Sequence, residues 1–321
     1  MIIVTGAAGF IGSNIIKGFN ESGITDILAV DDLTDGKKYR NLAVVQYRDY
    51  MDYQEFLKKI LQNDLFESDI TAIFHQGACS DTMEWNGQYM MKNNYEYSKF
   101  LLHYCLKKEI QFIYASSAAV YGAKNNFDDR NPNQLPLNVY GYSKWKFDEY
   151  VAPYLKSAKS QIVGFRYFNV YGPHENHKGK MASVAFHLMN QLENNGIVKL
   201  FSSYGGYGDG AHERDFVFID DVVKLNLWFY KNPAKKGIFN CGTGKARSFN
   251  DIAKTLIELN GSGKLEYIPF PDSLKGAYQC FTQANLTALR AMGFDQAFTS
   301  LEEGLAKYFQ WFHDAGKFHR G

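Results

Sequence analysis

The sequence predicts an α/β fold: a doubly wound parallel sheet with a smaller, interleaved C-terminal substrate domain. Short β-branched or aromatic runs alternate with amphipathic segments, a glycine-rich turn follows the first run, and the alternation loosens after about residue 172. Strands that alternate with helices form parallel sheets, because each crossover helix returns the chain to the same edge of the sheet.

The first half of the chain contains the clearest elements. The predicted strands are Ile2–Thr5, Ile27–Asp31, Ala72–His75, Phe112–Ala115 and Ile162–Tyr167. The predicted helices between them are Ile11–Ser22, Tyr53–Gln62, Tyr89–Lys107 and Lys144–Tyr154.

The second half is less regular. Residues 176–179 and 205–210 are predicted loops, and Ser183–Asn194 is a predicted helix. Arg214–Asp221 and Ile238–Gly242 are predicted strands that return to the first sheet. We therefore predict a dinucleotide-binding domain over residues 1–170, with returning segments near 214–242, and a mainly substrate-binding domain over residues 171–321.

Composition narrows the class of protein. The 321 residues are 45% hydrophobic and 21% charged, and the net charge of +1 gives no broad basic surface for nucleic acid. The four cysteines are widely spaced without a C-x-x-C pair, which indicates a reducing compartment. The apolar N-terminus lacks a basic segment and resembles a strand more than a signal peptide, and no apolar run suits a membrane span. We expect a cytoplasmic protein.

A glycine-rich turn follows the first predicted strand and opens the first helix. Gly6, Gly9 and Gly12 form the pattern G-x-x-G-x-x-G. Such glycines permit a tight turn, and the helix N-terminus offers free N–H groups to a pyrophosphate. This context predicts a Rossmann-type dinucleotide turn over a plain strand-to-helix connection.

The residues at the end of the second predicted strand do not decide between NAD and NADP. Asp31 and Asp32 lie where an acidic side chain commonly binds the ribose 2′-hydroxyl, which favours NAD. Lys37, Lys38 and Arg40 follow and could neutralise a 2′-phosphate, which favours NADP, although a solvated loop also accounts for them.

Tyr140 and Lys144 indicate redox chemistry. Their four-residue spacing puts them on one helix face, where the ammonium is expected to lower the pKa of the phenol below its usual value of about 10. Tyr140 would then act as acid or base, and Lys144 would bind the nicotinamide ribose. Ser116, at the end of the fourth predicted strand, could hydrogen-bond the reacting oxygen, whereas Tyr142 is assigned to packing.

This order of motifs resembles the extended short-chain dehydrogenase/reductase family, which includes nucleotide-sugar epimerases, dehydratases and reductases. Dehydratases of the family typically carry an Asp-Glu pair between the serine and Val-Tyr-Gly. Here residues 116–122 read Ser-Ser-Ala-Ala-Val-Tyr-Gly, without a carboxylate. The resemblance therefore favours the epimerases.

Two strings are more specific. Asn-Val-Tyr-Gly-Tyr-Ser-Lys at 138–144 and His-Lys-Gly-Lys-Met-Ala-Ser at 177–183 resemble the ADP-L-glycero-D-manno-heptose 6-epimerase family, and the similarity extends over roughly residues 1–311. His174 and His177 lack further ligand partners in the sequence, so no metal site is predicted.

The resemblance implies a role for each matching position. Tyr140 and Lys178 match two opposed acid/base residues, with Ser116 and Lys144 supporting the first. With the glycine turn included, the cofactor positions are Gly6, Gly9, Phe10, Ile11, Gly12, Asp31, Asp32, Lys38, Tyr53, Gln76, Gly77, Ala78, Cys79, Ser80, Asn93, Lys144, Val170 and Lys178. The substrate positions are Asn169, Lys180, His187, Phe201, Ser202, Ser203, Tyr204, Arg214 and Tyr278.

The resemblance also implies an activity. It implies inversion at C6 of an ADP-heptose through transient oxidation with tightly bound NADP, in the synthesis of a lipopolysaccharide core precursor, by a ring-shaped homo-oligomer that is usually a pentamer. Asp32 stands where Asn is usual and Tyr53 where Lys is usual; both changes remove help for a 2′-phosphate, so NAD stays open beside NADP. A UDP- or GDP-hexose 4-epimerase and a non-enzymatic dinucleotide-sensing protein are the alternatives.

Overall fold

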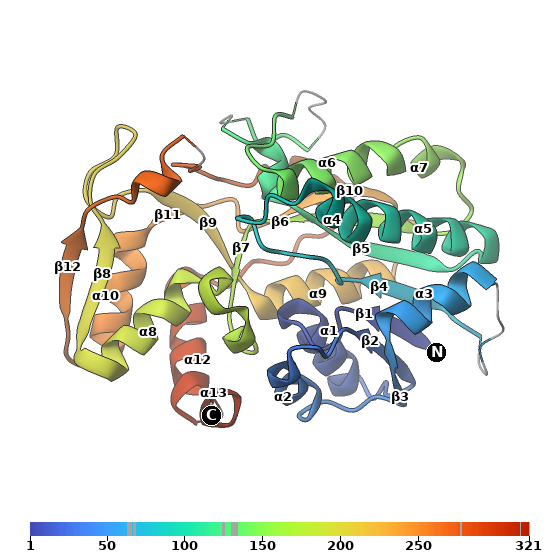
Figure 1. Ribbon diagram of the computed structural model, residues 1–321, viewed down its shortest axis with the longest axis horizontal. Coiled ribbons are helices and arrows are strands. Elements are labelled where there is room, and N and C mark those ends of the chain that lie inside the picture. The colour runs from blue at the N-terminus through green and yellow to red at the C-terminus, as the bar shows by residue number, and fades with distance from the viewer. Residues whose placement is uncertain are drawn as a thin grey trace.

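A seven-stranded parallel sheet forms the centre of the structure (Figure 1). The structure is a computed structural model that describes residues 1–62, 66, 69–123, 126–129, 134–276, 278–314 and 316–320. The strand order is β10-β6-β5-β4-β1-β2-β3, and every neighbouring pair is parallel. The strands are β1 (Ile2–Thr5), β2 (Ile27–Asp31), β3 (Asp49–Asp52), β4 (Ala72–His75), β5 (Gln111–Ser117), β6 (Ile162–Tyr167) and β10 (Gly237–Cys241). The predicted fold class is confirmed.

Helices follow the strands through most of the chain. They are α1 (Phe10–Glu21), α2 (Tyr39–Leu42), α3 (Tyr53–Gln62), α4 (Gly87–Met90), α5 (Tyr97–Lys108), α6 (Val139–Val151), α7 (Tyr154–Ser157), α8 (Val184–Asn195), α9 (Ile219–Tyr230), α10 (Phe249–Asn260), α11 (Thr287–Ala291), α12 (Leu301–Asp314) and α13 (Gly316–Arg320). A π-helical turn at Met91–Glu96 joins α4 to α5, so the predicted helix Tyr89–Lys107 is interrupted.

Both faces of the large sheet are buried, because alternate strand residues point to opposite sides. Val4 and Phe74 belong to the cluster that packs against α1 and α9, whereas Ile3 and Ile73 belong to the cluster that packs against α3, α5 and α6. This double burial explains why the central strands read as continuous apolar runs in the sequence.

Two smaller sheets lie beside the large one, at the left of Figure 1. One contains β7 (Asn169–Tyr171), β9 (Glu213–Phe218) and β11 (Ala246–Ser248), and the other pairs β8 (Ile197–Phe201) with β12 (Lys264–Ile268). The predicted strand Ile238–Gly242 does return to the large sheet, as β10 beside β6.

The prediction for residues 214–221 was wrong in two respects. The strand β9 pairs with β7 and β11, so it does not join the large sheet. It ends at Phe218, and Ile219 begins α9. Asp220 and Asp221 lie in the first turn of that helix, where acidic side chains favour a helix N-terminus.

Two further segments differ from the prediction. Helix α6 begins at Val139 and not at Lys144, because the Asn138 side chain caps it by accepting a hydrogen bond from the Gly141 amide at 2.8 Å. Residues 176–181 form 3-10 turns, broken at Gly179 where φ is 52°.

Three further observations on the described residues concern membrane spans, cysteines and metal ligands. No helix among them is long and apolar enough to cross a membrane. The four cysteines, Cys79, Cys105, Cys241 and Cys280, are free thiols. Within the same residues, no group of three or more His, Cys, Asp or Glu side chains is arranged to hold a metal ion.

Candidate active site

The predicted motifs meet at one edge of the large sheet. Gly6 follows β1, Gln76 follows β4, Ser117 ends β5 and Asn169 closely follows β6. These four strands are parallel neighbours, so their carboxyl ends share an edge. The chain order reverses between β1 and β4, and ligands bind in the crevice at such a switch point in α/β sheets.

The glycine turn has the shape that a pyrophosphate requires. Gly6 has φ +67°, and a Cβ on it would lie 2.6 Å from the Gly77 nitrogen. A Cβ on Gly12 would lie 2.1 Å from the Gly6 oxygen. Helix α1 starts after the extended Gly9 without a side-chain cap, so the N–H groups of its first turn, from Phe10 and Ile11 onward, are free for an anion. These residues fit a dinucleotide.

Replacing Gly12 with Ala is expected to weaken dinucleotide binding. The added methyl group meets backbone, and overpacking of this kind costs about 1–3 kcal/mol, or about five- to 150-fold in affinity. Titration calorimetry with NAD and NADP measures the change. Gly36→Ala is the matched control, since a Cβ there has no neighbour within 4 Å. Equal affinity in Gly12→Ala and the wild type would contradict the assignment of this turn.

The end of β2 carries a network of charges. The Asp31 carboxylate is buried, accepts a hydrogen bond from the Ala8 amide at 2.7 Å, and pairs with the Lys38 ammonium. Lys38 also donates to the Asp32 carbonyl at 2.6 Å. Hydrogen bonds from Thr34 hold the pKa of the Asp32 carboxyl below its usual value. A 2′-phosphate would therefore have to compete with these carboxylates for Lys38.

The segment after β4 is held by an asparagine that the sequence did not single out. Gln76, Gly77, Ala78, Cys79 and Ser80 form this segment. Asn94 accepts a hydrogen bond from the Cys79 amide at 2.8 Å and donates to the Cys79 carbonyl at 2.9 Å.

Two further predicted cofactor residues, Asn93 and Tyr53, lie on helical segments. Asn93 is partly exposed and donates to the Tyr89 carbonyl at 2.8 Å, one position before the buried Asn94. Tyr53 begins α3, where its hydroxyl accepts a hydrogen bond from Gln54 at 3.1 Å and its ring contacts Tyr97. The sequence has two adjacent asparagines, Asn93 and Asn94. This pair was the signal that could have indicated a structural role for Asn94.

The hydroxyl beside Tyr140 belongs to Ser117 and not to the predicted Ser116. Tyr140 lies in the first turn of α6 and is hydrogen-bonded to the Ser117 side chain. Ser116 points the other way and donates to the buried Asp148 carboxylate at 2.9 Å. Adjacent strand residues face opposite sides of a sheet, so one position decides which serine reaches the cleft.

The electrostatics of this pair also differ from the prediction. Burial raises the pKa of Tyr140, and the Ser117 hydrogen bond opposes that rise. Lys144 is 4% exposed and donates to the Ala115 carbonyl at 2.8 Å. Burial lowers the pKa of Lys144 to about 8, against the pull of Asp148. The Lys144 ammonium thus donates to a backbone carbonyl, and burial is the largest influence on the pKa of the Tyr140 phenol.

Lys178 reaches the glycine turn from the other half of the chain. Its ammonium lies 5.2 Å from the centre of the Phe10 ring. Burial lowers the pKa of Lys178, and Glu175 opposes this shift. Residues shortly before Lys178 in the chain are held against α1. The Asn14 side chain donates to the Pro173 carbonyl at 3.0 Å, and the Ser13 hydroxyl lies 3.0 Å from Nδ1 of His174.

Four predicted substrate residues form one cluster. Arg214 is 6% exposed, and its guanidinium lies 4.8 Å from the Tyr278 ring centre. Tyr204 stacks on Phe270 at 4.1 Å, and Phe270 also contacts Phe201 and Tyr278. Arg214 forms no ion pair with a carboxylate in the described chain, and burial lowers its pKa. A buried guanidinium that has no carboxylate partner among the described residues, and that lies beside aromatic rings, suits a phosphate group.

The other predicted substrate and cofactor residues are less tied to this cluster. Ser202 and Ser203 follow β8, where their amides donate to the Ile268 carbonyl and to Asp209. The rest lie on β7, on the 176–181 turns or on α8, with no hydrogen bond, ion pair or ring contact to the cluster in the described residues: Asn169, Val170, Lys180 and His187.

Comparisons with known proteins agree with this geometry. The sequence profile of the NAD dependent epimerase/dehydratase family matches residues 2–242. The crystal structure of ADP-L-glycero-D-manno-heptose-6-epimerase from Helicobacter pylori is 33% identical, with a TM-score of 0.84 over 98% of this chain and 96% of that one.

Two UDP-glucose 4-epimerase structures share the fold. The enzyme from Thermotoga maritima, solved with UDP-glucose, is 27% identical with a TM-score of 0.80 over 98% of this chain and 99% of that one. The enzyme from Thermus thermophilus, solved with NAD, is 24% identical with a TM-score of 0.80 over the same shares. The resemblance read from the sequence is confirmed.

Proposed function

Because the chain belongs to the NAD dependent epimerase/dehydratase family, we propose that it inverts C6 of the heptose in ADP-D-glycero-D-manno-heptose and so produces the L-glycero epimer. The observation that carries the proposal is the pair of partly buried proton-transfer groups: Tyr140 against Ser117, and Lys178 over Phe10 of the glycine turn. The heptose is supported by the 33% identity over nearly the whole chain.

The residues that would hold the dinucleotide lie along the sheet edge. The turn at Gly6 and the start of α1 would take the pyrophosphate, Asp31 and Lys38 the adenosine ribose, and Lys144 the nicotinamide ribose. When bound, this cofactor would accept the hydrogen of the sugar carbon as a hydride and would return it. We propose NADP, supported by the position of Lys38, with NAD as the alternative because neither the Asp32 carboxylate nor Tyr53 offers a positive charge to a 2′-phosphate.

Inversion requires a proton-transfer group for each of two alcohols that point in opposite directions. The raised pKa of Tyr140 keeps its phenol protonated at neutral pH, so Tyr140 suits the donor. The lowered pKa of Lys178 raises its neutral fraction, so Lys178 suits the acceptor. We assign the acceptor role to Lys178 and the donor role to Tyr140 in one direction of the reaction, and the reverse in the other.

Arg214 would bind the diphosphate of the sugar nucleotide, so Arg214→Met is expected to raise KM. A hydrogen bond to a charged group contributes about 1.5–3 kcal/mol, or about ten- to 150-fold in KM, and kcat should change far less. Arg247→Met is the control, because Arg247 pairs with Asp251 and Glu302 instead. Steady-state kinetics with both variants measures the difference; an unchanged KM in Arg214→Met would remove Arg214 from the site.

The test of the proposed reaction is direct. Purified protein is incubated with ADP-D-glycero-D-manno-heptose, the products are separated by chromatography, and the bound cofactor is released and identified. The L-glycero epimer is expected without added dinucleotide. A panel of UDP- and GDP-hexoses, with NMR of C4 and C6, tests the 4-epimerase that the Thermotoga enzyme suggests. Cofactor binding without turnover of any sugar would favour a dinucleotide-sensing protein.

Several wider features belong to the same proposal. We propose a dinucleotide-binding domain over residues 1–170, with segments near 214–242, and a mainly substrate-binding domain over 171–321. The free thiols support a cytoplasmic protein. A role in lipopolysaccharide core synthesis and a homopentameric ring rest on the similarity to the heptose epimerases; light scattering of the purified protein tests the ring.

A further inference from the structure

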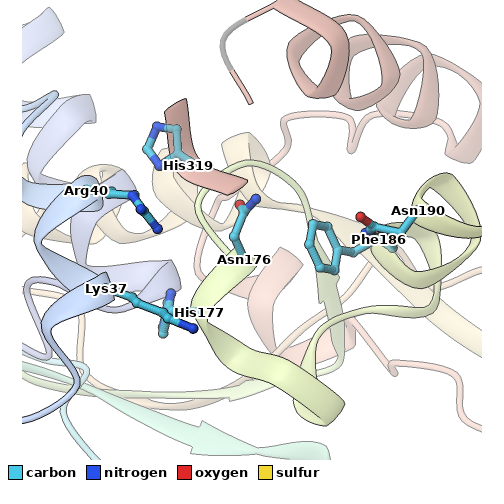
Figure 2. A pocket seen from close by; sticks show the side chains of 7 residues that line it. All are labelled: Lys37, Arg40, Asn176, His177, Phe186, Asn190 and His319. Carbon is cyan, nitrogen blue, oxygen red and sulfur yellow. Dashed lines mark hydrogen bonds between the residues drawn. The ribbon is translucent and has the colours of Figure 1, made fainter. Parts of the chain in front are cut away.

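A pocket lies where residues 37–40, the 176–181 turns, α8 and α13 come together (Figure 2). Its volume is about 190 Å³. None of the side chains that line it is among the cofactor or substrate positions that the family resemblance implies, although the sequence offered Lys37 and Arg40 as partners for a 2′-phosphate. They are Lys37, Arg40, Asn176, His177, Phe186, Asn190 and His319.

The pocket is electropositive. Lys37 and Arg40 enter it from the same side in Figure 2, and neither forms an ion pair with a carboxylate of the described residues. No acidic side chain is among the lining residues. Burial lowers the pKa of His177 to about 4, with Lys38 and Lys178 acting in the same direction and Asp35 against them. Such a cavity favours an anion.

The pocket is separate from the adenosine-ribose contacts. Lys37 and Arg40 are three residues apart, which puts them on one face of the helical segment 36–42. Lys38 lies between them in sequence but turns to Asp31 and Asp32. The side chains of the two neighbouring lysines therefore lie in different surroundings, Lys37 at the pocket and Lys38 at the end of β2.

Asn176 leaves both ends of its amide without a partner. Its Nδ2 and Oδ1 atoms are buried, and neither has a hydrogen bond in the described structure. A buried polar atom without a partner costs about 1–3 kcal/mol. Because Asn176 lines the pocket, an occupant that both accepts and donates hydrogen bonds would satisfy it.

Asn41 fixes the hydrogen-bonding roles of the two histidines. Its Nδ2 donates to the Ala8 and His174 carbonyls, so Oδ1 must be the acceptor that faces Nδ1 of His319 at 3.2 Å. His319 thus carries its proton on Nδ1, which leaves Nε2 as an acceptor. The Nδ1 of His177 lies 3.3 Å from Nδ2, and an amide nitrogen cannot accept a hydrogen bond, so we place the His177 proton on Nε2, which is then a donor.

We propose that this pocket binds inorganic phosphate, as the hydrogen phosphate ion. Lys37, Arg40 and the Asn176 amide would donate to its oxygens, and the Asn176 carbonyl or His319 would accept from its P–OH group. Sulfate at neutral pH has no such hydroxyl and would leave the acceptors unsatisfied. The site goes beyond the proposed epimerase and lies beside the turn that carries Lys178.

Titration calorimetry of the full chain, loaded with its cofactor, tests the proposal. Inorganic phosphate should bind saturably and more tightly than sulfate at equal ionic strength. The Lys37→Met/Arg40→Met double variant should bind phosphate about tenfold or more weakly. Lys58→Met/Lys254→Met removes the same charge from exposed positions and should bind like the wild type.

Asn176→Leu gives a second readout that does not depend on charge. The variant removes both unpartnered atoms, so its Tm without phosphate should not fall, and the rise in Tm that phosphate gives the wild type should disappear. A fall in Tm together with an intact phosphate response would contradict the role of Asn176.

Several outcomes would overturn the site. They are absent or unsaturable binding, equal binding of sulfate, and unchanged binding in the Lys37→Met/Arg40→Met variant. Loss of phosphate binding in protein loaded with NADP, but not with NAD, would show that the ribose phosphate of the cofactor fills the pocket. All of these readouts are independent of turnover, so they stand apart from success or failure of the epimerase assay.

Discussion

Replacing Tyr140 with Phe is expected to lower kcat by about 10²- to 10⁴-fold, because a positioned proton-transfer group contributes that much. The variant keeps the ring in the first turn of α6 and removes the hydroxyl that is bonded to Ser117. Lys178→Met should have a loss of similar size, since it removes the second group while its neighbour Phe10 remains. Single-turnover kinetics measures the chemical step in both variants.

Controls separate proton transfer from packing. Tyr142→Phe removes the hydroxyl of a tyrosine that is 42% exposed and two residues away, so this variant should keep wild-type kcat. Lys178→Arg keeps the positive charge but cannot supply a neutral acceptor, so it should lose activity like Lys178→Met. The account of two opposed groups fails if the Tyr140→Phe/Lys178→Met double variant keeps full epimerase activity.

The largest expected effect on stability comes from Asp148. Its carboxylate is 1% exposed and accepts hydrogen bonds from Arg166 and Ser116 at 2.9 Å and from Tyr114 at 3.0 Å. Asp148→Ala leaves the Arg166 guanidinium buried without its partner, which costs about 3–5 kcal/mol of the free energy of unfolding. Urea unfolding followed by circular dichroism measures this loss.

A surface pair provides the comparison. Lys159 is 82% exposed and pairs with Glu109, so Lys159→Met should leave the free energy of unfolding nearly unchanged. Asp148 also holds the pKa of Lys144 up, so any folded Asp148→Asn protein should show that lysine titrating below about 8. An Asp148→Ala protein as stable as Lys159→Met would contradict the network.

The central strands were predictable because their burial leaves a local signal. The bounds of β1, β2, β4 and β6 agree with the prediction, since strands covered on both faces read as short apolar runs. The strand β3 at the sheet edge reads Asp-Tyr-Met-Asp and is partly exposed, so it gave no such run. The partners of β9 depend on β7 and β11, which lie far away in sequence, and no local pattern could indicate them.

The site was predictable where a motif is local. The glycine turn and the spacing from Tyr140 to Lys144 are fixed by a few residues, and the structure keeps their geometry. The choice between Ser116 and Ser117 depends on which face of β5 meets the cleft, a property of the whole sheet. Phe270, which joins the substrate cluster, is brought there by the pairing of β12 with β8.

The central claim concerns the hydrogen on the inverted carbon. We expect that hydrogen to leave C6 and return to C6 within one active site, with Tyr140 and Lys178 handling only the hydroxyl protons. The most direct measurement converts ADP-D-glycero-D-manno-heptose in D₂O and examines C6 of the product by NMR. The account predicts complete inversion with no deuterium at C6; deuterium at C6 of the L-glycero product would contradict it.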